Sequence, residues 1–267
     1  MLIKRLRSYS VALLFLTALA ACSGDAGADV DPDQVDAVEQ PELGACRVLS
    51  PDDVAKSSNA TKTVDCAKPH TAETFAVGAL PESFDDVDYD DKALGKFAYQ
   101  TCSENYSKFL GADDSLVMRT VLSWAWFRPS EKAWDDGARW YRCDVIGGGD
   151  QSKEYVNLPA TTRDLMLGKP NDKWMVCADG ASVAGSVKVP CSEPHTWRAV
   201  TTIKVGADTA EYPGDRLVEV KSRDFCSKSV VAWLNYPPDY QFGYTWFHEA
   251  EWEAGNRRSV CWAKTTK

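Results

Sequence analysis

Several signatures of catalysis are missing from this 267-residue sequence. It contains no G-x-S-x-G nucleophile turn, no H-E-x-x-H zinc motif, no phosphate-binding P-loop and no G-x-G-x-x-G segment that opens a helix. Histidine, the side chain used most often as a general base, occurs only three times, as His70, His195 and His248. We therefore expect a protein that binds rather than catalyses, with no catalytic residues, no bound metal and no cofactor.

The chain also lacks an excess of positive charge. It has 30 Lys and Arg against 39 Asp and Glu, which gives a net charge of -9. An acidic balance of this size opposes binding to the phosphate backbone of nucleic acids and to anionic lipid headgroups. We therefore expect no nucleic acid partner and no electrostatic docking on an anionic membrane.

Long apolar segments are absent apart from a short one near the N-terminus. Residues 11–19 are apolar except for Thr17, and a run of this length is too short to span a bilayer. It follows Lys4, Arg5 and Arg7, as the apolar part of a secretory signal follows its basic part. Since Arg5 and Arg7 are not adjacent, a twin-arginine signal is not indicated.

The end of this segment, Leu19-Ala20-Ala21-Cys22, resembles the lipobox of bacterial lipoproteins. That resemblance implies that residues 1–21 are a signal peptide removed before Cys22, and that the Cys22 sulfur carries lipid with acyl chains such as palmitate. The protein is then expected on the cell membrane, lipid-anchored at the extracytoplasmic face. The alternative is an ordinary secreted protein with a free thiol at Cys22, which would be a liability outside the cell.

Basic residues are missing from the next segment. Residues 23–44 contain few large apolar side chains and cannot bury enough surface to fold, while their like charges extend the chain. We expect residues 22–44 to form an acidic disordered tether that holds the folded part off the membrane; a role in solubility alone is the alternative. The seven acidic residues are Asp25, Asp29, Asp31, Asp33, Asp36, Glu39 and Glu42.

Closely spaced cysteine pairs are absent as well. Without C-x-x-C, both a zinc site and C-x-x-C-H haem attachment are disfavoured. Besides Cys22 there are eight cysteines in two sets of four, and an even number in an exported chain indicates disulfides. Four cysteines allow three connectivities, among which the sequence does not choose. We expect sequential pairing: Cys46–Cys66, Cys102–Cys143, Cys177–Cys191 and Cys226–Cys261.

What the chain does contain is a duplicated block. Cys-Ala-Lys-Pro-His-Thr at residues 66–71 returns as Cys-Ser-Glu-Pro-His-Thr at residues 191–196. A Trp nine residues before the fourth cysteine of each set is repeated too. Such agreement indicates two copies of one domain. We predict repeat domain 1 at residues 45–147, a linker at 148–170 and repeat domain 2 at 171–267.

Each repeat has the pattern of an α+β unit with a mostly antiparallel sheet and one packed helix. Short strands are expected near the first two cysteines, and alternation predicts a longer strand after each Pro-His turn. Apolar residues at steps of three and four predict a helix near 94–110, with a counterpart at 218–234 that has the third cysteine and Trp233 on its buried face. Two strands close each unit, at 116–127 and 140–146, and at 240–247 and 258–263.

The duplicated histidines are the first candidates for contact with a ligand or partner. A proline before His70 and His195 sets a turn, which the imidazole can hold by bonding the local backbone. The alternative is a histidine that contacts a ligand or senses pH, with Glu73 as the partner of His70. The second repeat has Arg198 where the first has Glu73.

A second duplicated pattern, W-x-x-G-x-R, supplies the other candidates. It contains Trp134 and Arg139 in the first repeat, and Trp252 and Arg257 in the second. Trp and Arg are enriched where proteins contact their partners. The interpretation that we favour is structural, with Trp covering the core and Gly adopting a turn conformation.

These elements together resemble the septum formation family of actinobacterial exported and membrane-linked proteins. The resemblance rests on the C-x-x-P-H-T block, the helix cysteine and the terminal W-x-x-G-x-R…C run, over about residues 45–145 and 172–265. It implies a role in formation of the division septum and supplies no catalytic residues. Repeat 2 departs from the pattern at Arg198.

We therefore expect a binding or scaffold module of the cell envelope. Its expected partners are the membrane, through the lipid on Cys22, and an envelope or division protein. One alternative is a solute-binding or sensor lipoprotein with a ligand held between the repeats. Another is an envelope hydrolase built around His70 or His195.

Overall fold

Two α+β domains of the same topology make up the protein. The computed structural model describes residues 30–149 and 152–265. Each domain has a five-stranded sheet, in the order β2-β1-β3-β5-β4 in domain 1 and β7-β6-β8-β10-β9 in domain 2. All neighbouring strands are antiparallel. The α+β class and the tandem repeat predicted from the sequence are confirmed.

Domain 1 combines its sheet with one long helix and several short ones. The strands are β1 (Cys46–Arg47), β2 (Thr63–Val64), β3 (Ala72–Ala79), β4 (Ser123–Phe127) and β5 (Trp140–Ile146). The helices are α1 (Pro51–Val54), the 3-10 turn η1 (Glu82–Phe84), α2 (Lys92–Leu110), α3 (Asp114–Val117) and α4 (Glu131–Asp135).

Domain 2 repeats this arrangement with fewer short helices. Its strands are β6 (Val176–Asp179), β7 (Val187–Pro190), β8 (Trp197–Lys204), β9 (Phe242–Thr245) and β10 (Arg258–Lys264). Its helices are α5 (Asp215–Trp233) and α6 (Glu249–Ala254).

The long helices form where the sequence places apolar residues four apart. On α2 the residues Leu94, Ala98, Cys102 and Tyr106 are all buried. Asp91 caps the start of α2 by accepting from the Ala93 amide, and the helix ends where Gly111 adopts a φ of 69°. The equivalent stripe on α5 consists of Val218, Ser222, Cys226 and Val230.

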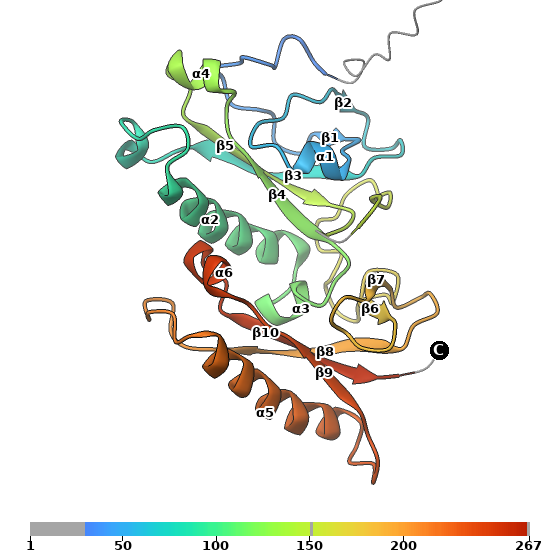
Figure 1. The fold of residues 1–267 in the computed structure, drawn as a ribbon. Coiled ribbons are helices and arrows are strands. Elements are labelled where there is room, and N and C mark those ends of the chain that lie inside the picture. The colour runs from blue at the N-terminus through green and yellow to red at the C-terminus, as the bar shows by residue number, and fades with distance from the viewer. Residues whose placement is uncertain (1–29, 150–151, 266–267) are drawn as a thin grey trace, which may run out of the picture.

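Sheets and helices alternate along the molecule (Figure 1). From the top of the view, the sheet of domain 1 is followed by α2 and α3, then by the sheet of domain 2, and finally by α5. The middle helices therefore lie between two sheets, whereas α5 covers the outer face of the second sheet. This arrangement places α6 of domain 2 against α2 of domain 1, which matters for the site described below.

Four disulfides staple the two domains in the same way. Two of them, Cys102–Cys143 and Cys226–Cys261, tie the long helix to the last strand of its sheet, with Cα–Cα distances of 5.7 and 5.0 Å. The other two, Cys46–Cys66 and Cys177–Cys191, tie the first strand to a cysteine one or two residues beyond the second. Sequential pairing is therefore confirmed. Cys22, by contrast, lies outside the described residues, as does the predicted signal peptide at 1–21.

Two predicted strands are too long: the one at 240–247 is β9 only at Phe242–Thr245, and the one at 116–127 is shortened by seven residues at its start. Residues 116–127 contain β4 only from Ser123 onward, because Asp113 caps the preceding helix α3 by accepting from the Leu116 amide at 2.7 Å. The apolar residues after this cap give the sequence the pattern of a continuous strand, although the first of them belong to α3.

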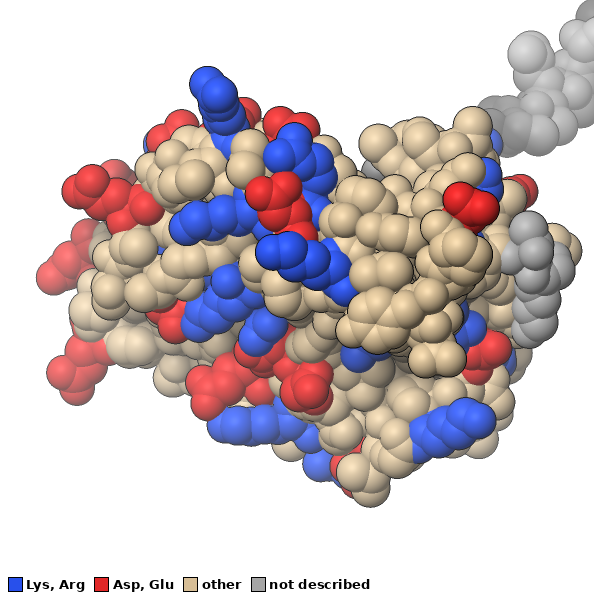
Figure 2. All heavy atoms as spheres, turned by 90° about the horizontal axis from the view of Figure 1, so that it is seen from below, with Lys and Arg blue, Asp and Glu red and all other residues tan. Residues whose placement is uncertain are grey.

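Trp233 is half exposed, at 50%, although we expected it on the buried face of its helix. Its counterpart Phe109 is 8% exposed and lies beneath the guanidinium of Arg163, which is 4.6 Å from the ring centroid. Among the described residues of domain 2, no segment covers Trp233 in this way. Figure 2 shows the α5 side of the molecule, with mixed charges at its left and centre and a broad uncharged area farther right.

Residues 30–44, part of the expected disordered tether, lie against domain 1. Val30 forms a β-bridge with Thr61, and the Trp140 indole donates to the Ala37 carbonyl at 3.2 Å. The Gly44 amide donates to the Thr74 carbonyl at 2.9 Å. The described part of this segment is therefore a docked arm, and the expectation of disorder is corrected for residues 30–44. Residues 22–29 lie outside the described part.

Residues 152–170, most of the expected linker, also pack on domain 1. Leu158 and Met166 are buried in the core around Phe109 and Cys102. The amides of Asp164 and Met166 donate to the carbonyls at the end of α2. Their many polar neighbours suggested a spacer, but the two apolar side chains bury this segment against the domain.

Domain 1 contacts domain 2 directly through the residues between α3 and β4. Met118 and Val121 pack on an apolar patch of the second sheet. The Val121 amide donates to the Trp174 carbonyl at 3.0 Å, and the Val176 amide donates to the Arg119 carbonyl at 2.8 Å. Apolar burial and backbone hydrogen bonds therefore fix the two domains relative to each other. The patch on the second sheet is formed by Val176, Ala178, Val183, Trp197, Ala199, Val260 and Trp262.

Candidate functional site

The two duplicated histidines close identical turns. His70 Nδ1 lies 2.8 Å from the Lys68 carbonyl oxygen, and His195 Nδ1 lies 2.7 Å from the Glu193 carbonyl oxygen. Both imidazoles are buried, with 0% and 6% exposure. This geometry agrees with the interpretation that each histidine holds its own Pro-His turn.

The threonine that follows each histidine braces the first strand of its sheet. Thr71 donates to the Leu49 carbonyl and accepts from the Leu49 amide, at 2.7 Å in both cases. Thr196 does the same with Gly180, at 2.8 and 3.1 Å. The sequence patterns assigned no role to these threonines, and their identity in both copies was the signal that pointed to them.

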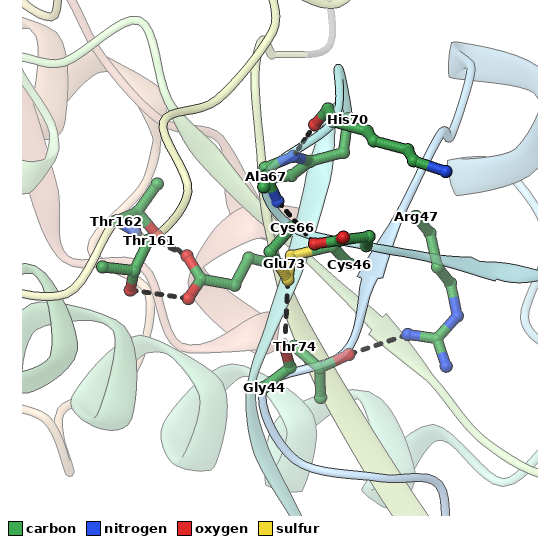
Figure 3. The surroundings of a disulfide bond; sticks show 12 residues. Gly44, Cys46, Arg47, Cys66, Ala67, His70, Glu73, Thr74, Thr161 and Thr162 are labelled. Carbon is green, nitrogen blue, oxygen red and sulfur yellow. Dashed lines mark hydrogen bonds between the residues drawn. A yellow bond between two sulfur atoms is a disulfide. The ribbon is translucent and has the colours of Figure 1, made fainter.

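Glu73 anchors the segment after domain 1 instead of pairing with His70. Its carboxylate accepts from the Thr161 hydroxyl at 2.8 Å, and from the Thr162 amide and hydroxyl at 2.6 Å each. Figure 3 shows the Glu73 side chain directed toward these threonines and away from His70. The proposed His70–Glu73 pair is therefore not formed.

Arg198, at the equivalent position of domain 2, also binds the connecting segment. Its Nη2 lies 2.6 Å from Asp172 Oδ1. Both copies thus use this strand position to fix residues between the domains, one with a carboxylate and one with a guanidinium. The loss of the acidic residue from the second copy follows from the charge of its partner.

In each W-x-x-G-x-R block the arginine stacks on the tryptophan of the same block. The guanidinium of Arg139 lies 4.0 Å from the Trp134 ring centroid, and that of Arg257 lies 3.6 Å from the Trp252 ring centroid. Both tryptophans are 4% exposed. The arginines also bond backbone carbonyls across the loop, Arg139 to Asp85 at 2.9 Å and Arg257 to Asp208 at 3.2 Å. The tryptophans cover the core, as the structural interpretation requires.

Buried charges set domain 1 apart from domain 2. Arg142 Nε lies 3.1 Å from Asp144 Oδ2, and both side chains are fully buried. Arg47 joins them through the Thr74 hydroxyl, which accepts from Arg47 at 2.9 Å and donates to Asp144 at 2.7 Å (Figure 3 shows the Arg47–Thr74 bond). Burial lowers the pKa of Arg142 to about 10, against the opposing pull of Asp144. The equivalent positions of domain 2 hold Ala178, Ala199, Val260 and Trp262.

A cleft of about 710 Å³ lies between the domains, with α2 and β4 on one side and the ends of β8 and α6 on the other. Gly255 allows this close approach, because a Cβ atom there would lie 2.5 Å from Tyr99 Cδ1. Burial raises the pKa of Tyr99 to about 12, although Arg257 and Arg258 oppose the shift. Of the seven predicted contact residues, all of which the structure describes, Arg257 alone lines this cleft.

Neither a metal cluster nor a membrane-spanning helix occurs in the described part of the chain. Within 30–149 and 152–265, no three His, Cys, Asp or Glu side chains are grouped so that they could hold a metal ion. No helix in those same ranges combines the length and the apolar character needed to cross a bilayer.

Comparison with known proteins gives one match. The model of the septum formation family matches residues 28–128 and, a second time, residues 119–261. No curated protein and no solved structure matches the chain. Because the two matches together span most of the sequence and both domains, the chain belongs to the septum formation family.

Proposed function

We propose that this protein is a lipid-anchored binding module on the outer face of the cell membrane that takes part in forming the division septum. The observation that carries the division role is the match of both domains to the septum formation family. The four disulfides support an oxidising compartment outside the cytoplasm. The Leu19–Cys22 sequence supports the anchor.

Binding rather than turnover is supported by how the duplicated side chains are used. Each of the two buried histidines bonds a carbonyl oxygen of its own turn, and each arginine of the W-x-x-G-x-R blocks bonds its own loop. The duplicated motifs therefore stabilise the fold, and we expect partners to bind at other surfaces or in the cleft. The partner that we propose is an envelope or division protein.

Localisation in dividing cells tests this proposal. A fluorescent fusion of the full chain is expected at the cell periphery with enrichment at septa, and deletion of the protein is expected to disturb septum formation. The variant Cys22→Ser is expected to lose the membrane signal while keeping its fold. Uniform peripheral signal together with normal septa on deletion would refute the division role, and unchanged membrane retention of the variant would refute the lipid anchor.

A second candidate function is favoured by the cleft between the domains. A solute-binding or sensor lipoprotein holds its ligand at such a position, and domain boundaries are common places for small-molecule sites. This function is compatible with a role at the septum, because a ligand bound between the domains can report on the state of the envelope.

A further inference from the structure

We propose that the cleft between the domains binds an amphipathic anion, which places its charged group near Lys96 and Arg257 and its apolar body against Met118, Leu122 and Trp124. This inference rests on the second candidate function and names the chemistry of its ligand. It does not depend on where in the cell the protein acts.

The size and position of the cleft suit a small molecule. Its volume of about 710 Å³ falls within the range of roughly 300–1,000 Å³ that is typical of ligand sites. Both domains line it, so a ligand there contacts α2 and β4 on one side and β10 on the other.

One side of the cleft is apolar and aromatic. Val117, Met118 and Leu122 line it together with Trp124 and Tyr99. The Tyr99 and Trp124 rings are 5.9 Å apart, edge to face, and each remains partly exposed. An aliphatic chain or a planar ring that packs here removes apolar surface from water on both partners.

The charge of the cleft differs from that of the whole chain. The protein has a net charge of -9, yet four basic side chains and three acidic ones line the cleft. Ion pairs join Lys204 to Asp208 at 2.8 Å and Arg258 to Asp114 at 3.5 Å. The third acidic residue, Glu104, pairs with Lys108 at 2.6 Å.

Two cations of the cleft are therefore left without a carboxylate at ion-pair distance among the described residues: Lys96 and Arg257. The guanidinium of Arg257 donates to the neutral carbonyl oxygens of Trp252, Asn256 and Asp208, and the Asp208 carboxylate acts on it only from beyond ion-pair distance. An anionic group in the cleft supplies the missing negative charge, and such charge-assisted contacts are among the stronger ones available to a ligand.

A fluorescence titration with 8-anilinonaphthalene-1-sulfonate tests the site, because this probe joins a sulfonate to an aromatic body. The purified protein is compared with Lys96→Glu in the cleft and with Lys221→Glu on α5. Both lysines are exposed on long helices, and the charge change is identical, but Lys221 lies outside the cleft. We expect about tenfold weaker binding for Lys96→Glu and no change for Lys221→Glu.

Two further measurements define the chemistry of the ligand. Trp124→Ala is expected to weaken probe binding as well, since it removes the aromatic wall. Dodecyl phosphate is expected to displace the probe, whereas inorganic phosphate at the same concentration is not. Far-UV circular dichroism and the unfolding midpoint show that each variant is folded before it is titrated.

Equal affinities for the two lysine variants would overturn the proposed site, and displacement by inorganic phosphate would overturn the amphipathic character of the ligand. Neither result bears on septal localisation, which is measured separately in cells. Failure of this inference is thus distinguishable from failure of the division role.

Discussion

At several equivalent positions of the two repeats, domain 1 has a charged residue and domain 2 has an apolar one. Beside the matching cysteines, domain 1 carries Arg142 and Asp144 where domain 2 carries Val260 and Trp262. In domain 1 this face is covered by a polar loop, and Arg142 bonds the carbonyl and side chain of Asn59 there. In domain 2 the same face receives Met118 and Val121 from the other domain. The partner that covers the face therefore explains the residue type at each position.

The buried Asp144 is expected to be the most sensitive charged residue. Asp144→Asn leaves the Arg142 guanidinium buried without its ion-pair partner and removes the largest counter-charge of Arg47, which should lower the free energy of unfolding by about 3–5 kcal/mol. Asp224→Asn is the matched control, because Asp224 pairs with Arg223 in a half-exposed pair that should contribute about 0–1 kcal/mol. Urea unfolding of both variants measures the difference. A loss below about 1 kcal/mol for Asp144→Asn would contradict this account.

At the scale of elements, two segments without regular secondary structure complete domain 1. Residues 30–44 run along one side, and residues 152–170 cover the end of α2. Both resemble spacers in the sequence because they are rich in polar residues. They are held by a few specific contacts, Asp36 with Ser130 at 2.8 Å and Glu73 with Thr161 at 2.8 Å among them. Substitution of either carboxylate should therefore release one segment and leave the sheet intact.

Glu73→Gln is expected to loosen the segment that follows domain 1. The neutral amide loses the charge-assisted bonds to Thr161 and Thr162, so the Asp164 and Met166 amides should exchange hydrogen faster. Hydrogen exchange followed by mass spectrometry measures this. Glu104→Gln is the control, since its carboxylate is 68% exposed on α2. Unchanged exchange in residues 158–166 would show that the apolar side chains alone hold the segment.

The docked arm is expected to respond to acid. A hydrogen bond from Ser130, together with Lys132, lowers the pKa of Asp36 below its usual value of 3.8. A carboxyl whose pKa is lowered in the folded state stabilises that state above its unfolded pKa, and the contribution is lost as pH falls through the folded pKa. The arm should therefore loosen only below about pH 4.

The indole N–H of Trp140 reports on this change by NMR, because it donates to the Ala37 carbonyl at 3.2 Å. We expect its chemical shift to move as the pH falls below about 4. Asp36→Asn should show the shifted position already at neutral pH and no titration. An indole signal that titrates identically in the variant would assign the change to another group.

At the scale of the whole molecule, the two domains form a stack of alternating sheets and helices. The sheet of domain 2 is covered on one face by its own α5 and on the other by Met118 and Val121 of domain 1. The second domain therefore depends on the first for part of its apolar burial. This dependence predicts that the domains unfold together.

Met118→Glu is expected to uncouple them. A charge placed against the apolar patch of the second sheet opposes burial, so a single calorimetric transition should separate into two, with domain 2 unfolding first. Val48→Glu is the control, since Val48 is 52% exposed on domain 1. One unchanged transition in Met118→Glu would mean that the backbone hydrogen bonds from Val121 to Trp174 and from Val176 to Arg119 suffice to couple the domains.

Much of the architecture follows from local patterns along the chain. The period of four in α2 and the alternation in β3 are properties of neighbouring residues, and the duplicated cysteines and Pro-His-Thr turns indicate that one unit occurs twice. The strand predicted at 140–146 has the same bounds in the structure. Local patterns are less informative at residues 116–127, where a single side-chain cap at Asp113 converts an apolar run into a short helix.

The repeat, the class of fold and the residue types available for disulfides and turns can be predicted from the sequence, because they depend on neighbours along the chain. The folded structure was needed to show that Glu73 binds Thr162, that residues 30–44 are docked and that a cleft lies between α2 and β10. Each of these depends on segments far apart in the sequence, whose packing is selected by burial and charge after the local elements have formed. The sequence placed Arg257 in a repeated motif, and only the packing of two domains turned that position into the wall of a cleft.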